Sequence, residues 1–189
     1  MKILVHICCA PCFAYPHKRL LEEGHEVTGY WYNPNIHPYM EYRARMESLQ
    51  KYAEIEEVDV VYDKYDFVEY LKMQLQNVER PQRCINCYSY RMERAAKYAK
   101  ENKFDAFTTT LLVSHHQYHE KIKSVGEEMA KKYGIPFYYE DFRQGYRQGK
   151  AVAKAYSLYS QKYCGCLISE WERFGGMKKT KAENPLNKV

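Results

Sequence analysis

Short apolar runs alternate with longer segments of helical periodicity, and this alternation constrains the fold more than any other feature. The strand-like runs are 2–8, 26–32, 58–62, 105–113 and 136–139, and the helix-like segments are 13–24, 39–55, 66–77, 88–102, 118–133 and 146–174. Strands that alternate with helices form parallel sheets covered on both faces. We therefore predict an α/β fold, Rossmann-like and doubly wound, with a mostly parallel sheet, helices on both faces and a helical C-terminal segment.

The length of 189 residues is within the usual range for one domain. We predict a single domain over 1–174 and a polar tail over 175–189, where two glycines and a proline interrupt any regular pattern. No run approaches the roughly 18 apolar residues of a membrane helix, and the apolar start is too short for a signal peptide. We therefore expect a cytoplasmic protein without a membrane partner.

The net charge of +5 lies partly in the tail, at Lys178, Lys179 and Lys181, so the body is only mildly basic. Such a charge permits an anionic partner without requiring one. The chain also contains 20 tyrosines, and clusters such as 30–32 have side chains that can stack on nucleic-acid bases. For any single tyrosine, a place in the core is the more common role.

The first strand runs directly into Cys8, Cys9 and Cys12. In doubly wound sheets ligands bind outside the carboxyl ends of the strands, where the strand order reverses. A nucleotide-binding protein would carry a glycine-rich loop here, and its absence argues against ATP. If the fourth strand neighbours the first, the hydroxyls of 108–114 emerge beside these cysteines. Three histidines follow the fourth strand: His115, His116 and His119. They are candidates for an acid, a base or an RNA contact, and the alternative is that they belong to a polar loop.

Seven cysteines without an export signal indicate metal binding or redox chemistry, because cytosolic reductants keep ordinary thiols reduced. Cys84 and Cys87 form a CxxC motif, and Cys8 with Cys9 can face the same centre, which makes the four thiolates of a [4Fe–4S] cluster. A rival set, in which Cys12 replaces Cys8, suits structural zinc as well. A thioredoxin-like pair at Cys9 and Cys12 is a further alternative, although it leaves the other cysteines unexplained.

Cys164 and Cys166 are separated by one glycine, a spacing too tight for easy chelation of a tetrahedral metal. Gly165 permits the bend that brings the two sulfurs together, and strained disulfides are the easily reduced ones. We interpret the pair as a dithiol/disulfide relay. The alternative is that both cysteines pack at a helix start.

Several segments between residues 8 and 166 form a specific series: Cys8–Cys12, Tyr32–Ile36 with Pro38, Glu41, Tyr42 and Arg45, Arg83–Cys87, Phe107–Leu111 with Ser114, Asp141–Arg143, and Tyr163–Cys166. This series resembles the cobalamin-independent epoxyqueuosine reductases, the QueH family. The chain departs from the family pattern after Ser114 and after Arg143.

The resemblance implies an oxidoreductase that reduces the epoxide of epoxyqueuosine in tRNA to the alkene of queuosine, the last step of queuosine formation. It implies that Cys8, Cys9, Cys84 and Cys87 hold a [4Fe–4S] cluster and that Cys164 and Cys166 form a redox-active disulfide. It also implies one additional mononuclear iron, with Cys12 and Asp141 as candidate ligands, no cobalamin, and an unidentified electron donor. The competing class is a non-catalytic nucleic-acid-binding module with a four-cysteine zinc site, and a reductase acting on another substrate is a third possibility.

Overall fold

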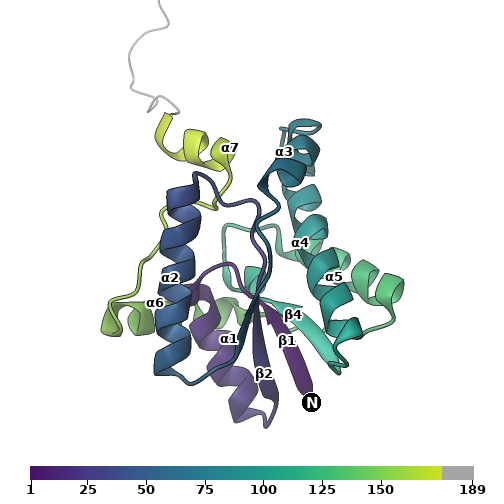
Figure 1. The fold of residues 1–189 in the computed structure, drawn as a ribbon, viewed down its shortest axis with the longest axis vertical. Helices are drawn as coiled ribbons and strands as arrows, with labels where there is room; N and C mark the ends of the chain where they lie inside the picture. The colour runs from purple at the N-terminus through teal and green to yellow at the C-terminus, as the bar shows by residue number, and fades with distance from the viewer. Residues whose placement is uncertain (176–189) are drawn as a thin grey trace, which may run out of the picture.

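The computed structural model describes residues 1–175, which form a four-stranded sheet between two layers of helices (Figure 1). The strands are β1 (Lys2–His6), β2 (Glu26–Trp31), β3 (Val60–Tyr62) and β4 (Ala106–Thr109). All pair in parallel in the order β3-β2-β1-β4. The order reverses between β1 and β4, because the chain moves outward from β1 to β3 and then returns to the other side of β1. The predicted α/β class is confirmed.

The helices of the described residues are α1 (Ala10–Glu22), α2 (Tyr39–Ile55), α3 (Phe67–Leu75), α4 (Gln82–Glu101), α5 (His119–Tyr133), α6 (Tyr146–Ala155) and α7 (Leu167–Glu170). Short helical turns occupy Thr110–Val113, Phe142–Gly145 and Trp171–Gly175. Gly24 follows α1 with a φ of +77°, a conformation that glycine adopts without strain, so the predicted end of this helix is confirmed.

The sheet separates two apolar cores, one under α1, α2 and α6 and one under α4 and α5. Ile3 and Val5 point into the first core, whereas Leu4 points into the second and packs with Met92 and Phe107. Successive residues of a strand face opposite sides, so a central strand covered on both faces must be apolar throughout. This is why β1 reads as a continuous apolar run.

Two predicted strands are shorter than expected. The strand predicted over 105–113 ends at Thr109, whose side-chain oxygen accepts a hydrogen bond from the Leu111 amide (3.2 Å) and starts a helical turn. The strand predicted over 136–139 is reduced to one bridge between Phe107 and Phe137. Pro136 has no amide proton to extend the pairing with β4.

The predicted helix over 146–174 is also interrupted. Helix α6 ends at Ala155, and an irregular segment, 156–166, leads to α7. Ser157 (φ 51°) and Gly165 (φ 132°) have left-handed backbone conformations that no α-helix accommodates. Apart from Gly175, the predicted polar tail lies outside the described residues, and the single-domain assignment stays a prediction.

The aromatic cluster Tyr30, Trp31 and Tyr32 is buried, with at most 2% of any of the three residues exposed. Trp31 packs against Tyr42 of α2, and Tyr30 stacks on Tyr98 of α4. The suggestion that this cluster stacks on nucleic-acid bases is therefore wrong, because β2 lies inside the sheet with helices on both faces. Within residues 1–175, no helix is long and apolar enough to cross a membrane.

Candidate functional site: a thiol-lined cavity

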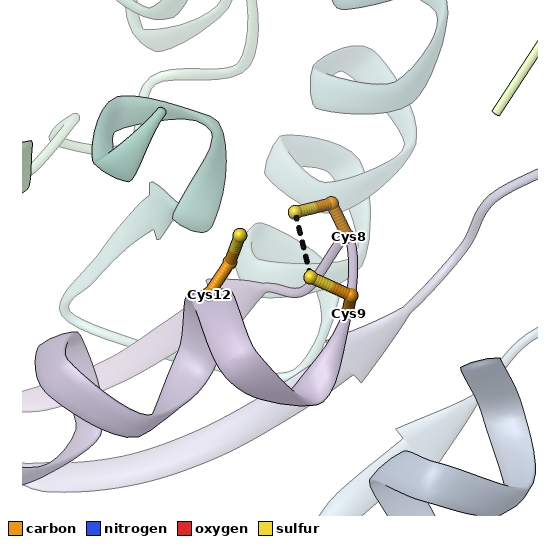
Figure 2. A group of neighbouring side chains, drawn as sticks. All are labelled: Cys8, Cys9 and Cys12. Carbon is orange, nitrogen blue, oxygen red and sulfur yellow. Dashed lines mark hydrogen bonds between the residues drawn. The ribbon is translucent and has the colours of Figure 1, made fainter. Parts of the chain in front are cut away.

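The turn after β1 gathers three thiols at the carboxyl edge of the sheet. Cys9 lies just before α1 in an extended conformation, and Cys12 lies in the first turn of that helix. The sulfurs of Cys8, Cys9 and Cys12 all lie within 4.8 Å of one another, and Figure 2 shows them pointing toward one another between the strand end and the helix. The geometry therefore groups Cys12 with the two adjacent cysteines, so both predicted four-cysteine sets remain open.

The turn after β4 supports this group, as expected if β4 neighbours β1. The Cys8 amide donates to the Thr110 hydroxyl (2.9 Å), which in turn donates to the Cys8 sulfur (3.2 Å). Hydrogen bonding with Cys12 and with Cys9 lowers the pKa of Cys8 well below its usual value, whereas burial raises the pKa of Cys9 to about 12. The pKa of Cys8 is therefore lowered by the same group of thiols in which burial raises the pKa of Cys9.

The CxxC motif lies in the first turns of α4, which begins at Gln82 rather than at the predicted residue 88. Cys84 lines the cavity described below. Burial is the main cause that raises the pKa of Cys84 to about 12, and the nearby Cys164 adds to it. One turn after Cys87, the buried Arg91 directs Nη1 to the Cys87 sulfur (3.9 Å) and donates from Nη2 to Asn33 (2.6 Å). A buried cation therefore lies beside these thiols.

The CxC motif lies in the irregular segment between α6 and α7 and is held by main-chain contacts. Arg45 of α2 donates to the carbonyl oxygens of Tyr163 and Cys164, each at 3.1 Å. The His37 amide donates to the Gly165 carbonyl (2.7 Å). The φ of 132° at Gly165 explains why a glycine separates the two cysteines. Both are free thiols here, so their pairing stays a prediction.

The three cysteine segments surround one cavity of about 580 Å³. The cysteines that line it are Cys8, Cys12, Cys84, Cys164 and Cys166, and the basic residues are Arg45, Arg80, Arg83, Arg91, Lys150, Lys162 and Arg173. Among the described residues that line it, Glu172 is the one carboxylate, and it is paired with Arg80 (2.7 Å) and Arg83 (2.5 Å). The cavity is therefore both thiol-rich and strongly basic.

The other predicted site residues are divided between this cavity and its surroundings. Ser114 and His116 line it, whereas His119 is buried and hydrogen-bonds Tyr139 (3.0 Å). Asp141 is not among the lining residues, and its carboxylate accepts hydrogen bonds from Arg143, which lower its pKa to about 2. Its proposed role as an iron ligand stays a prediction that these contacts do not support.

The sequence interpretation missed three side chains that donate to the thiols. Gln161 donates to the Cys9 sulfur (2.8 Å), Gln117 donates to the Cys164 sulfur (3.4 Å), and Arg91 approaches Cys87. Only Arg91 carries a sequence signal, because it follows the cysteine by four residues on one helix face. The two glutamines come from loops whose positions depend on the tertiary fold.

The donor set fits a thiolate-bound metal centre. Cysteine thiolates select zinc and iron–sulfur clusters, and a donor to a ligand sulfur, such as that of Gln161 to Cys9, is typical of such sites. The buried Arg91 guanidinium offsets the negative charge that several thiolates on one metal centre would carry.

Fold and site together define a class: an α/β protein with a thiol-lined, basic cavity at the carboxyl edge of a parallel sheet. The family model described as "Epoxyqueuosine reductase QueH" matches residues 3–172. The chain is 41% identical over 175 residues to a QueH epoxyqueuosine reductase from Dehalococcoides mccartyi, covering 92% of this chain and 95% of the relative. It is 33% identical to one from Thermotoga maritima (90% and 91%) and 34% identical to one from Haemophilus influenzae (94% and 77%). The chain belongs to the QueH family, which is a family of oxidoreductases, so the resemblance in its motifs is confirmed.

Proposed function

We propose that this chain reduces the epoxide of epoxyqueuosine in tRNA to the alkene of queuosine, the last step of queuosine formation. The observation that carries the proposal is the meeting of three cysteine segments around one basic cavity, in a chain that belongs to the QueH family. The reaction breaks the two carbon–oxygen bonds of the epoxide and releases the oxygen as water. It consumes two electrons and two protons.

The cysteines supply sites for both kinds of electron carrier. In our proposal Cys8, Cys9, Cys84 and Cys87 hold a [4Fe–4S] cluster, which when bound transfers electrons one at a time. Oxidation of the Cys164 and Cys166 dithiol to a disulfide releases two electrons and two protons, which matches the demand of the reaction. An external electron donor then reduces the disulfide to the dithiol again, with two electrons and two protons.

Cys12 is the remaining cysteine of the cavity and is our candidate ligand for an additional iron ion. Such an ion would act as a Lewis acid toward the epoxide oxygen. The Asp141 carboxylate is engaged by Arg143 and does not line the cavity, so it is the weaker candidate. The proposed reaction requires no cobalamin.

The basic lining supports tRNA as the partner. Phosphate groups pair with lysine and arginine, and Lys150, Lys162 and Arg173 bring such charges to the cavity. A cavity of about 580 Å³ has the size of sites that enclose a small organic ligand, which is the scale of one nucleoside. We propose the cytoplasm as the location, because the substrate is a tRNA.

The test is turnover by anaerobically purified protein whose iron, sulfide and zinc contents are measured first. The protein is incubated with tRNA that carries epoxyqueuosine and a low-potential reductant, and the nucleosides are analysed by mass spectrometry. The proposal requires iron with sulfide and loss of one oxygen from the modified nucleoside. Stoichiometric zinc without sulfide would instead favour the binding module, and a cluster without turnover would favour another reductive substrate.

A further inference from the structure

The cavity is too small for the RNA loop that would carry the modified nucleotide. A volume of about 580 Å³ is within the range that encloses one small organic ligand. The nucleotides on either side of the reacting one must therefore lie on the protein surface around the cavity. Their unpaired bases need contacts there, because proteins commonly hold splayed RNA bases by stacking on aromatic side chains.

The segment formed by α7 and the following turn has one face in the cavity and one in solvent. Ser169, Glu172 and Arg173 line the cavity. The opposite face carries Leu167, Trp171 and Phe174, which are 45%, 65% and 58% exposed and follow a helical spacing of four and three residues. Figure 1 shows this segment at the end of the molecule away from the N-terminus.

The exposed aromatic face is continuous with the cavity wall. The Phe174 ring packs edge-on against Tyr163, a lining residue, at 6.1 Å between ring centroids. The Trp171 indole lies against the backbone of Gly175, where an added Cβ would come within 2.6 Å of the ring. Each ring therefore has a neighbour on one side and is still open to solvent.

Exposure of Trp171 stands out because the other tryptophan of the chain, Trp31, is fully buried. An exposed apolar face beside a functional cavity marks an interaction surface. The charges favour RNA over a protein partner, because basic side chains such as Arg80 and Arg173 line the adjoining cavity. Glu172, the carboxylate among the described lining residues, is paired with arginines.

We propose that Trp171 and Phe174 form a stacking surface for an unpaired RNA base next to the nucleotide that enters the cavity. The inference rests on the proposed function and adds to it the residues that hold the RNA outside the cavity. Stacking on an aromatic face tolerates any base, so the surface contributes affinity and orientation rather than recognition of one sequence.

The test is the affinity of the anaerobically purified protein for a tRNA that carries guanine in place of the modified base, measured at fixed salt. Trp171→Ala should raise Kd by about 10-fold, within the range for loss of one stacked base. Trp171→Phe should restore most of the affinity. Tyr62→Ala is the matched control, since Tyr62 is also exposed but lines a separate surface pocket. Wild-type affinity of Trp171→Ala would overturn the proposal.

Fluorescence gives a second readout that does not depend on catalysis. Because Trp31 is buried, acrylamide should quench mainly Trp171, and bound tRNA should protect it. Unchanged quenching with tRNA bound would overturn the stacking surface and leave the proposed reductase function standing. Absence of any tRNA binding by the wild-type protein would overturn both proposals. If the wild-type protein bound tRNA and Trp171 was protected from acrylamide, but epoxyqueuosine in tRNA was not reduced, only the reductase function would be overturned.

Discussion

Arg45 connects α2 to the CxC motif, and its removal should loosen that motif. The residue is 2% exposed, and its guanidinium makes three hydrogen bonds. Nε donates to Glu41 (2.7 Å), and the two terminal nitrogens donate to the carbonyl oxygens of Tyr163 and Cys164. At about 1.5 kcal/mol for each of the three charge-assisted bonds, Arg45→Met should remove about 4–5 kcal/mol of stability. This agrees with about 3–5 kcal/mol for breaking a buried ion pair.

Arg43 is the matched control, because it lies two residues away on the same helix and is also paired with a glutamate one helical turn away, Glu47. The Arg43 pair is exposed, so Arg43→Met should leave the unfolding midpoint nearly unchanged. Arg45→Lys should recover only part of the loss, since one ammonium group cannot reproduce the planar fork of contacts.

The assay combines urea unfolding with hydrogen exchange of the His37 amide, which donates to the Gly165 carbonyl. If the CxC segment is held about 4 kcal/mol less firmly, the fraction of molecules in which it is detached rises roughly 1,000-fold. Protection of the His37 amide against exchange should fall by the same factor. If Arg45→Met and Arg43→Met gave the same midpoint and the same His37 protection, the assignment of Arg45 as the clamp of the CxC motif would be refuted.

Three further predictions follow, the first from the proposed function and the other two from the described contacts. If Cys84 holds the proposed cluster and Cys164 with Cys166 forms the proposed relay, Cys84→Ser should lose iron, whereas serine at both Cys164 and Cys166 should leave iron content intact and abolish turnover, as measured by metal analysis and nucleoside mass spectrometry. Burial lowers the pKa of His17 from the ordinary histidine value of 6.5. Below about pH 6.5, His17 therefore binds a proton more readily in the unfolded state than in the folded state. The unfolding free energy should therefore fall as pH decreases below about 6.5, and His17→Gln should flatten that slope in urea titrations. Gly149→Ala places a Cβ within 2.3 Å of a backbone oxygen of α1. Overpacking of about 1–3 kcal/mol should exceed the helix-propensity gain of about 1 kcal/mol, so calorimetry should show a lower melting temperature.

The alternation of strands and helices was readable from sequence because it reflects local periodicity. The apolar run 2–8 indicated the first strand of a parallel sheet, and β1 forms there, between β2 and β4. The placement of Cys8 beside the hydroxyl of Thr110 followed from the general rule for such sheets. Strand ends were less predictable, because the turn at Thr110 depends on a side-chain hydrogen bond rather than on apolarity.

Contacts between distant segments were decided by the tertiary structure alone. Gln161 reaches Cys9 across 152 positions, and Arg45 reaches Cys164 across 119. Neither contact leaves a periodic signal, because each depends on where a loop lies after the sheet and its helices have packed.

The two tryptophans show the same division between sequence and structure. Sequence determined that the chain has two large indole side chains and that Trp31 belongs to a strand-like run. Only the fold decided which of them meets solvent: β2 lies between two helical layers and buries Trp31, whereas the turn after α7 leaves Trp171 exposed. Burial is set by the elements that surround a residue, and those are fixed only when the whole chain has folded.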